Sequence, residues 1–278
     1  MADIKLFVSC HRPFSVPKHP LLNPIQVGTS LSGARFPGFL HDDEGENISA
    51  QNPSYCELTA QYWAWKNVRA DYYGFFHYRR YLYPDTGARR PYRIEGAPTP
   101  ELLDRLGYGR FSELIGRYDL ILPRGEDMHL PVRAHYAGAP FHHGEDLDLM
   151  EALIRERCPD YVPAMEEYLG GTRCYFGNIF IARQAVFEDY CGWLFPLLAE
   201  FDRRADLGGR RAQELRADGY LAERRLGVWA TRHRELGRLE LPRVHFIEDP
   251  KERRKRQLLN ALLPPGSLRR SVVKKAAR

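Results

Sequence analysis

Long apolar runs, paired cysteines and a secretory pattern are all missing from this sequence. No window holds the roughly 18 consecutive apolar residues that a membrane-spanning helix requires, so no such helix is expected. The five cysteines, at positions 10, 56, 158, 174 and 191, are odd in number and never form a Cys-x-x-Cys pair. They indicate reduced thiols rather than a disulfide framework or a zinc site, and we expect a cytoplasmic protein.

Four common catalytic motifs are also absent. The sequence contains no G-x-G-x-x-G, G-x-x-x-x-G-K-[ST], H-E-x-x-H or G-x-S-x-G. This absence argues against dinucleotide-binding enzymes, P-loop enzymes, zincins and α/β-hydrolases. A nucleophilic role for Cys56 or Cys174 is less expected than a place in the core, because lone cysteines usually pack as small apolar residues.

Charge is unevenly distributed along the 278 residues. Residues 251–278 contain ten Lys and Arg and one acid, which gives this segment a net charge of +9. Because the whole sequence carries +5, residues 1–250 carry −4. A mildly acidic body argues against nucleic acid as a partner, because such proteins present a basic face. The basic tail, with its interspersed Leu and Val, suits either peripheral contact with an anionic membrane or a solvated, disordered terminus.

Apolar and aromatic segments alternate between strand-like and helix-like patterns. Such an alternation indicates an α/β sheet. The expected strands are residues 4–9, 24–28, 72–83, 118–123, 173–183 and 241–249, and the expected helices are residues 52–68, 145–158, 160–169, 185–205 (kinked at Pro196) and 214–233 (beginning near Gly219). The Gly- and Asp-rich stretch 29–51 is expected to form a long loop.

Two acidic pairs are candidates for holding a metal ion. Asp146 and Asp148 lie at the start of an expected helix, where residues i and i+2 point about 200° apart and cannot easily share one ion. Asp146 is more simply explained as an acid in a first helical turn. Asp42 and Asp43 lie in the long loop and fit ordinary turn chemistry. We therefore expect no metal site at either pair, although Mn²⁺ or Mg²⁺ stays open.

Several segments, taken in order, resemble a bacterial family known as a domain of unknown function. They are VSCHRPF, PIQVG, NISAQNPSYCELTAQYWAWKN, YYGFFHYRRYL, DLILP, GNIFIARQAVFEDYCGWLF and GYLAERRLGVW, and the resemblance spans about residues 3–248. Members of that family occur in capsule, exopolysaccharide and O-antigen clusters and are regarded as glycosyltransferases of the type A fold. Some of them resemble galactofuranosyltransferases.

The resemblance implies a single Rossmann-like, type A glycosyltransferase domain with a mostly parallel central sheet flanked by helices. This domain would occupy residues 1–250, with a donor-binding half at about 1–125 and an acceptor-side half at about 126–250, followed by the tail 251–278. The implied reaction moves a hexose from a UDP-sugar to a growing or lipid-linked polysaccharide, with galactofuranose as the expected sugar and inversion as the expected outcome. A non-catalytic sugar-binding or scaffolding subunit is the alternative.

The same resemblance assigns roles to individual residues. The end of the first strand would meet the nucleobase, and the strand that usually ends in Asp-x-Asp would meet the diphosphate. That position here reads His77-Tyr78-Arg79, which puts the usual metal in doubt. We expect His77 and Arg79, on one face of a strand, to contact the diphosphate, and Arg80 to brace the site through an acid such as Glu57. The expected nucleotide-sugar contacts are Ser9, His11, Arg12, Val27, Asn52, Glu57, His77, Tyr78, Arg79 and Asn178.

The general base would be a carboxylate. Glu223, in a helix near the C-terminal end of the fold, is the first candidate, and Asp146 is the second. For Glu223 an ordinary first-turn acid beside Arg224 is an equally plausible explanation.

Overall fold

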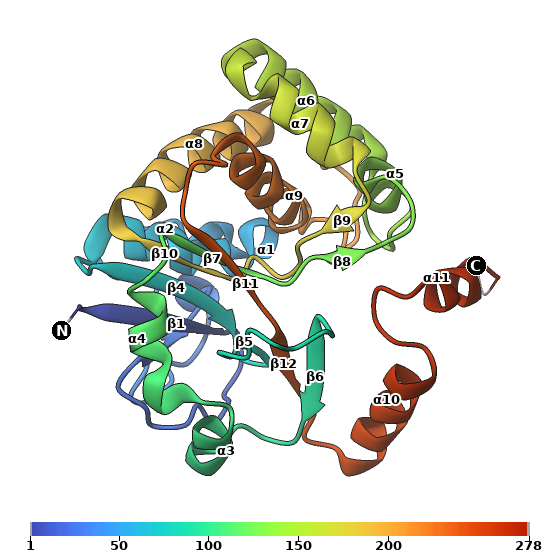
Figure 1. Ribbon diagram of the computed structural model, residues 1–278. Helices are drawn as coiled ribbons and strands as arrows, with labels where there is room; N and C mark the ends of the chain where they lie inside the picture. Colours follow the sequence, from blue (N-terminus) through green and yellow to red (C-terminus); the bar gives the residue numbers. More distant parts are fainter. Residues whose placement is uncertain (1, 277–278) are drawn as a thin grey trace.

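The computed structural model describes residues 2–276, which form a mixed sheet covered by helices on both faces (Figure 1). The main path of the sheet has the order β11-β7-β10-β4-β1-β2-β3. These strands are β1 (Ile4–Cys10), β2 (Leu22–Gln26), β3 (Leu40–His41), β4 (Tyr72–His77), β7 (Leu120–Pro123), β10 (Phe180–Arg183) and β11 (Arg238–Leu241). β1, β2, β3 and β4 are parallel, as are β7 and β11, whereas β10 runs against both its neighbours. The predicted α/β fold with a mostly parallel central sheet is confirmed.

The sheet continues past β4 through a tight turn. The additional strands are β5 (Arg80–Leu82), β6 (Tyr92–Glu95) and β12 (Arg243–Phe246). β12 pairs with β5 on one side and with β6 on the other. A separate two-stranded sheet joins β8 (Glu126–Asp127) to β9 (Arg173–Cys174). These short strands extend the sheet toward the C-terminal segment.

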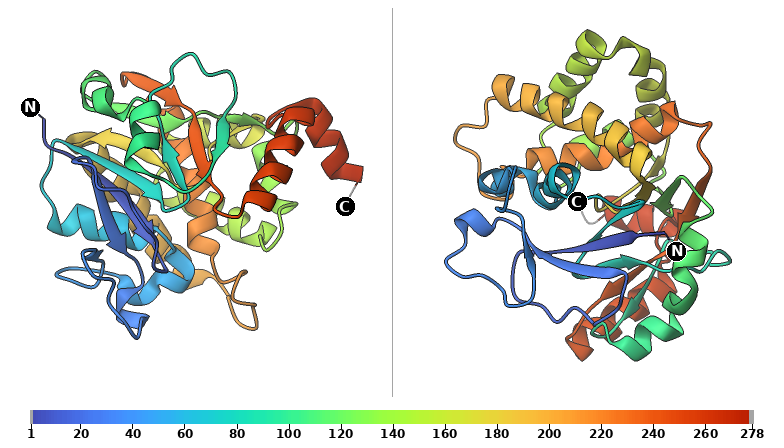
Figure 2. Two further views of the ribbon diagram at one scale, coloured as in Figure 1. Left: turned by 90° about the horizontal axis from the view of Figure 1, so that it is seen from below. Right: turned by 90° about the vertical axis from the view of Figure 1, so that its left-hand side faces the viewer.

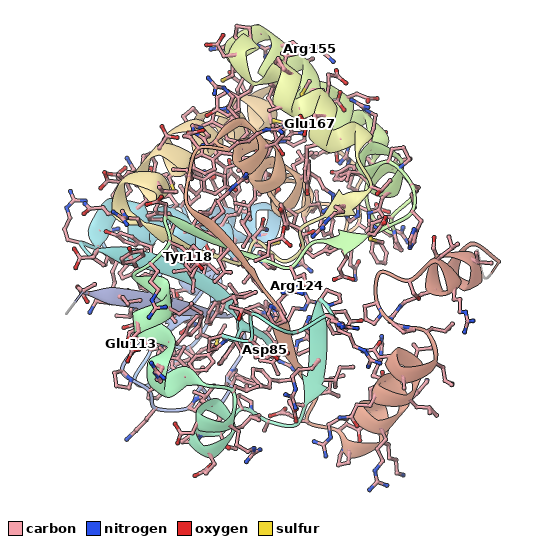
Figure 3. All side chains as sticks on the ribbon, viewed as in Figure 1. Asp85, Glu113, Tyr118, Arg124, Arg155 and Glu167 are labelled. Atoms are coloured by element: carbon pink, nitrogen blue, oxygen red, sulfur yellow. The ribbon has the colours of Figure 1, made fainter. Side chains whose placement is uncertain are left out.

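The helices form layers on the two faces of the sheet. One face is covered by α1 (Asn52–Tyr55), α2 (Leu58–Asn67), α8 (Gln184–Arg204) and α9 (Ala217–Arg232), and the other by α3 (Pro100–Arg105) and α4 (Phe111–Ile115). Next to α8 and α9 lie α5 (Val132–Ala137), α6 (Gly144–Arg157) and α7 (Val162–Gly170). Arg155 on α6 and Glu167 on α7 lie on this outer layer, far from the sheet (Figure 3). No helix in the described part of the chain is both long and apolar enough to cross a membrane.

Two hydrophobic clusters, one on each face, account for the sheet's position. Alternate residues of β1 enter different clusters, with Phe7 packing beneath α2 and Leu6 and Val8 packing on the opposite face. Strands buried on both faces read as continuous apolar runs, which is why residues 4–9 are recognisable as a strand from sequence. The same reasoning explains β4, whose aromatic side chains divide between the two clusters.

Several expected elements differ from those observed. The helix expected over residues 52–68 is broken at Cys56, whose backbone has φ 54° and ψ −128°. The strand expected over residues 72–83 is two strands joined by a turn, and the one expected over 173–183 is β9 and β10 with a loop between them. β11 was not expected at all. Pro196 lies inside α8, which continues as one helix on both sides of it.

The basic tail is folded through residue 276, which argues against the solvated, disordered terminus that was one of its two expected alternatives. It forms α10 (Pro250–Leu262) and α11 (Leu268–Ala276), which lie to one side of the body, with α10 next to β6 (Figures 1 and 2). Asp249 caps α10 by accepting hydrogen bonds from the amides of Lys251 and Glu252. This helix start has the preferred residues, with Asp at the N-cap and Pro at the first helical position.

Gly227 allows α9 to pack closely against α7. A Cβ atom at this position would lie 1.9 Å from Cζ of Tyr168, inside its van der Waals radius. We expect Gly227→Ala to destabilise the protein by about 2 kcal/mol or more, since overpacking typically costs about 1–3 kcal/mol. Gly192→Ala in α8 is the matched control, because nothing lies within 4 Å of its added Cβ. That control should gain about 0.5–1 kcal/mol from helix propensity. Urea unfolding of both variants measures the difference, and equal stabilities would contradict the close packing.

Candidate active site

A cavity of about 320 Å³ opens where β1 and β4 end. The carboxyl ends of neighbouring parallel strands are the usual ligand-binding edge of an open α/β sheet. Of the residues predicted to bind the nucleotide sugar, six line this cavity: Ser9, His11, Val27, Asn52, Glu57 and His77. Cys56 and Arg216 line it as well. A neighbouring groove of about 430 Å³ is lined by Arg12 and Arg79, together with Arg80.

The end of β4 is a hairpin turn rather than a continuing strand. β4 ends at His77, Tyr78 and Arg79 form the turn, and Arg80 pairs directly opposite His77. The expectation that His77 and Arg79 share a strand face is therefore wrong. Residues directly opposite in an antiparallel pair point to the same face, so His77 and Arg80 are the neighbours here. Arg79 is exposed at the tip of the turn, whereas Arg80 is half-buried.

The Tyr78 ring packs against the basic side chains of the site. Its side chain is almost fully buried and lines neither cavity, so it differs from the expected donor contact. Its ring centre lies 4.3 Å from that of His77 and 5.2 Å from that of His11. The guanidinium groups of Arg12 and Arg79 lie 5.2 Å and 5.1 Å from the same ring centre. One aromatic ring thus orders two histidines and two arginines around it.

The side chains at this turn create a strongly positive environment. Burial, and then the charges of Arg80 and Arg79, hold the pKa of His77 well below its usual value. The pKa of His11 is lowered by burial and by Arg12, Arg79 and Arg216. Within residues 2–276, the Arg80 side chain has no hydrogen-bond or ion-pair partner. Burying half of an arginine side chain without a partner costs free energy, and a bound anion would offset that cost by accepting its hydrogen bonds.

Two carboxylates meet on the other side of Arg80. Glu57 Oε1 accepts a hydrogen bond of 3.1 Å from Asn178 Nδ2, and Glu223 Oε1 accepts one of 2.8 Å from the amide of Gly177. Burial raises the pKa of Glu57, and the charge of Glu223 raises it further. Burial lowers the pKa of Arg80, and the negative charges of Glu223 and Glu57 raise it, so both charges act on its guanidinium. The expected Arg80–Glu57 ion pair does not form directly among the described residues.

Glu223 lies in the second turn of α9 rather than at its start, because α9 already begins at Ala217. Its other carboxylate oxygen accepts a hydrogen bond of 2.8 Å from Arg224. The Glu223 side chain keeps 18% of its surface exposed, whereas that of Arg224 keeps 1%. Because each carboxylate oxygen has two lone pairs, Glu223 is oriented by these bonds and still able to accept a proton.

The second candidate base is engaged elsewhere. Arg210 holds Asp146 with two hydrogen bonds of 2.7 Å and 2.8 Å, and both side chains are buried. Asp146 lines neither cavity, and nor do Glu223 and Asn178, but those two bond Gly177 and Glu57 beside the first cavity. Asp42 is fully buried, where it accepts hydrogen bonds from the amides of Gly28 and Thr29 and from the Ser49 hydroxyl. These acids stabilise the fold and are not gathered into one site.

Two residues with positive φ and two unpaired polar atoms lie at the cavity or beside it, where Asn178 bonds the cavity-lining Glu57. Cys56 and Asn178 both have positive φ, 54° and 49°, which residues with a side chain rarely adopt. Asn52 spans the break before α2 by donating a hydrogen bond of 2.7 Å to the Cys56 carbonyl. Ser9 Oγ and Asn178 Oδ1 are buried without a hydrogen-bond partner in the described chain. Buried polar atoms are normally paired, so unpaired ones here are consistent with a ligand that completes them.

The donor set does not fit a divalent cation. Among the described residues, no group of three or more His, Cys, Asp or Glu side chains is placed to hold a metal ion. The side chains that replace the usual Asp-x-Asp are a histidine and arginines, which favour an anion. Glu57 and Glu223 are the acids at hand, and they are already held by Asn178, Gly177 and Arg224.

Two site residues were not identified from sequence. Arg216, just before α9, donates a hydrogen bond of 3.0 Å to Cys56 Sγ and lines the cavity. It lies 160 positions from Cys56, and no local pattern distinguishes it from other arginines. Gly177 has a recognisable signal, because a Gly-Asn pair marks a turn, but that turn was assigned to the strand.

Comparison with known proteins agrees with this geometry. No curated protein matches the chain. A solved structure described as the apo form of WbbM, a bifunctional glycosyltransferase, superposes with a TM-score of 0.83 at 28% sequence identity. The match covers 88% of this chain and 45% of that one, so the chain spans less than half the length of WbbM. A family model described as a domain of unknown function (DUF4422) matches residues 5–234. Because this match covers most of the sequence, the chain belongs to that family.

Proposed function

We propose that this protein is a glycosyltransferase that takes a sugar from a UDP-sugar, with galactofuranose as the first candidate. The acceptor would be a growing bacterial surface polysaccharide, such as a capsule, an exopolysaccharide or an O-antigen. The observation that carries the proposal is the cluster of His11, His77, Arg79, Arg80 and Arg216 at the ends of β1 and β4, beside two carboxylates. The similarity to a bifunctional glycosyltransferase supports the same class of reaction.

The proposed chemistry follows from the charges around the turn. When the sugar leaves, negative charge develops on the diphosphate, and preorganised cations stabilise it. Arg80 and Arg79 would supply these cations, because the planar guanidinium can bind two phosphate oxygens at once. His77 and His11, with lowered pKa values, would act as neutral hydrogen-bonding partners near pH 7.

The remaining residues divide between the nucleoside and the sugar. Ser9, His11, Val27 and Asn52 line the cavity and would receive the nucleoside, with Arg12 at its edge. Glu57 and Asn178, joined by a hydrogen bond, would face the donor sugar. Glu223 would accept the proton from the attacking hydroxyl in an inverting transfer. Asp146 stays a weaker candidate because Arg210 already occupies both of its oxygens.

The partner and location follow from the substrates. A polysaccharide in synthesis on a lipid carrier would bring the enzyme to the cytoplasmic face of the inner membrane. The basic segment 251–278 would provide peripheral contact there.

UDP release tests the proposal. We expect the purified protein to release UDP from UDP-galactofuranose, or from another UDP-hexose in a panel, faster with a glycan acceptor than without one. The release should persist in excess EDTA, because the cluster of arginines occupies the position of the usual metal ligands. UDP-sugar binding without release would favour a non-catalytic sugar-binding subunit. Activity that vanishes with EDTA and returns with Mn²⁺ would contradict the role given to the arginines and redirect attention to Asp42, Asp43, Asp146 and Asp148.

A further inference from the structure

The outer face of the C-terminal helices combines exposed apolar and basic side chains. Four of the large apolar residues that the described chain leaves most exposed lie here: Leu258 at 62%, Leu262 at 66%, Leu268 at 62% and Val272 at 58%. Monomeric proteins rarely expose several large apolar side chains close together unless they form an interaction site. The question is therefore what covers this face.

One face of α10 contacts the body of the protein, and the opposite face is exposed. Asn260 is its buried residue, and its amide oxygen accepts hydrogen bonds from Tyr92 and Arg270. Gln257, one turn earlier, donates a hydrogen bond of 3.0 Å to the Ile94 carbonyl of β6. This face is attached to the body, so α10 is held in a fixed orientation rather than free in solution.

The face of α10 opposite Asn260 can be located from the rotation of 100° per residue along a helix. Measured from Asn260, the side chains of Lys251, Lys255, Leu258 and Leu262 all lie within about 40° of the reverse direction. All four are exposed. One stripe of the helix thus carries two cations near its start and two leucines near its end. This is the pattern of a helix that lies in a membrane interface, with apolar side chains inserted and cations at the headgroups.

We infer that the outer face of α10 and α11 binds the surface of an anionic lipid bilayer. Charge supports a lipid partner over a second copy of this chain. Lys251 and Lys255 lie on this face, residues 251–278 as a whole carry a net +9, and the rest of the chain carries −4. Two copies meeting through this face would bring like charges together, whereas anionic headgroups neutralise them. The acidic remainder is repelled by the same surface, so only one orientation is favoured.

That orientation bears on the site, and this step rests on the proposed function. The groove beside the cavity has Arg79 and Arg80 on one wall and Glu252, Arg256 and Asn260 of α10 on another. A bilayer against the outer face of α10 would therefore lie one helix thickness from the groove. We assign the groove as the entrance for an acceptor whose glycan is anchored in that bilayer.

Vesicle sedimentation of the full-length protein tests the inference without any sugar substrate. Binding is expected to vesicles containing anionic phospholipid, to weaken as salt is raised, and to be lost on purely zwitterionic vesicles. Leu258→Ser with Leu262→Ser should weaken binding at least about tenfold. Lys251→Gln and Lys255→Gln should each weaken it about fivefold. Leu31→Ser is the matched control, because Leu31 is 59% exposed in the 3₁₀ turn Thr29–Leu31, outside the C-terminal helices, and should leave binding unchanged.

Three outcomes would overturn the inference. The first is equal binding by the double serine variant and by Leu31→Ser. The second is a native dimer that the double variant converts to monomers with no vesicle binding, which would identify a second copy as the partner. The third is binding to DNA in place of vesicles. None of these readouts depends on UDP release, so failure of the lipid surface and failure of the proposed function are separate results.

Discussion

Replacing Glu223 with glutamine is expected to lower turnover by a factor on the order of 10² or more while leaving UDP affinity unchanged. The amide oxygen can still accept the hydrogen bond from Gly177, so the loop keeps its position, whereas the amide nitrogen cannot accept the bond that Arg224 donates to the other carboxylate oxygen. What the variant loses is the proton acceptor, since a glutamine amide has no useful basicity. Binding and chemistry should therefore separate, with single-turnover rates falling and the dissociation constant of UDP constant.

Asp146→Asn serves as the comparison for that result. It removes a charge from a buried ion pair with Arg210, so we expect it to lower stability rather than turnover. If Glu223→Gln instead transfers sugar at the normal rate, the base must be a different carboxylate. Glu57, held by the same loop, would then be tested next, followed by Asp146.

Replacing Arg80 with alanine is expected to weaken UDP binding by about 10- to 150-fold, because a charge-assisted contact is typically worth about 1.5–3 kcal/mol. Affinity for uridine should stay the same, since Arg80 would contact only the diphosphate. Arg79→Ala should act in the same direction but less strongly, because its exposed charge is screened by solvent. Lysine at either position should recover only part of the loss, since an ammonium cannot bind two oxygens in the arginine geometry. Isothermal titration with UDP and uridine measures both affinities.

Two controls make the arginine result interpretable. Arg105→Ala removes an exposed arginine from α3, away from both cavities, and should leave UDP binding unchanged. Thermal unfolding of Arg80→Ala shows whether the half-buried site has collapsed. Normal UDP affinity in both the Arg79 and the Arg80 variants would mean that the hairpin is structural and that the diphosphate binds elsewhere.

The strands that end at the site could be predicted from sequence, because strands buried on both faces appear as continuous apolar runs. The run at Ile4–Cys10 and the aromatic run at Tyr72–His77 are apolar on both faces, and parallel pairing places their ends together. The turn at Tyr78 and Arg79 has no comparable sequence signal. Two-residue hairpin turns usually carry Asn, Asp or Gly, and here neither residue is one of these. The consequence was the wrong choice between Arg79 and Arg80 as the nearer neighbour of His77.

The break at Cys56 and the position of Arg216 were equally hidden. Nothing in the local sequence predicts a positive φ at a cysteine inside an otherwise helical pattern. It exists because tertiary contacts hold it, including a hydrogen bond from Ser54 to the buried Asp218. The helices of the tail were not predicted for a related reason. Its docked face consists of polar residues such as Gln257 and Asn260, which give no apolar periodicity.

The loop of Gly177 and Asn178 has a consequence for the order in which the protein is made. Asn178 reaches back 121 positions to Glu57, and its carbonyl accepts a hydrogen bond from Gln61, 117 positions away. Glu223 is synthesised later still. A ribosome that has finished β1 and β4 has therefore produced a pocket whose acids are not yet held in place. Contacts this distant in sequence form only after the intervening chain has closed into a loop. An incomplete chain would thus lack an organised site, and activity would appear only when α9 docks.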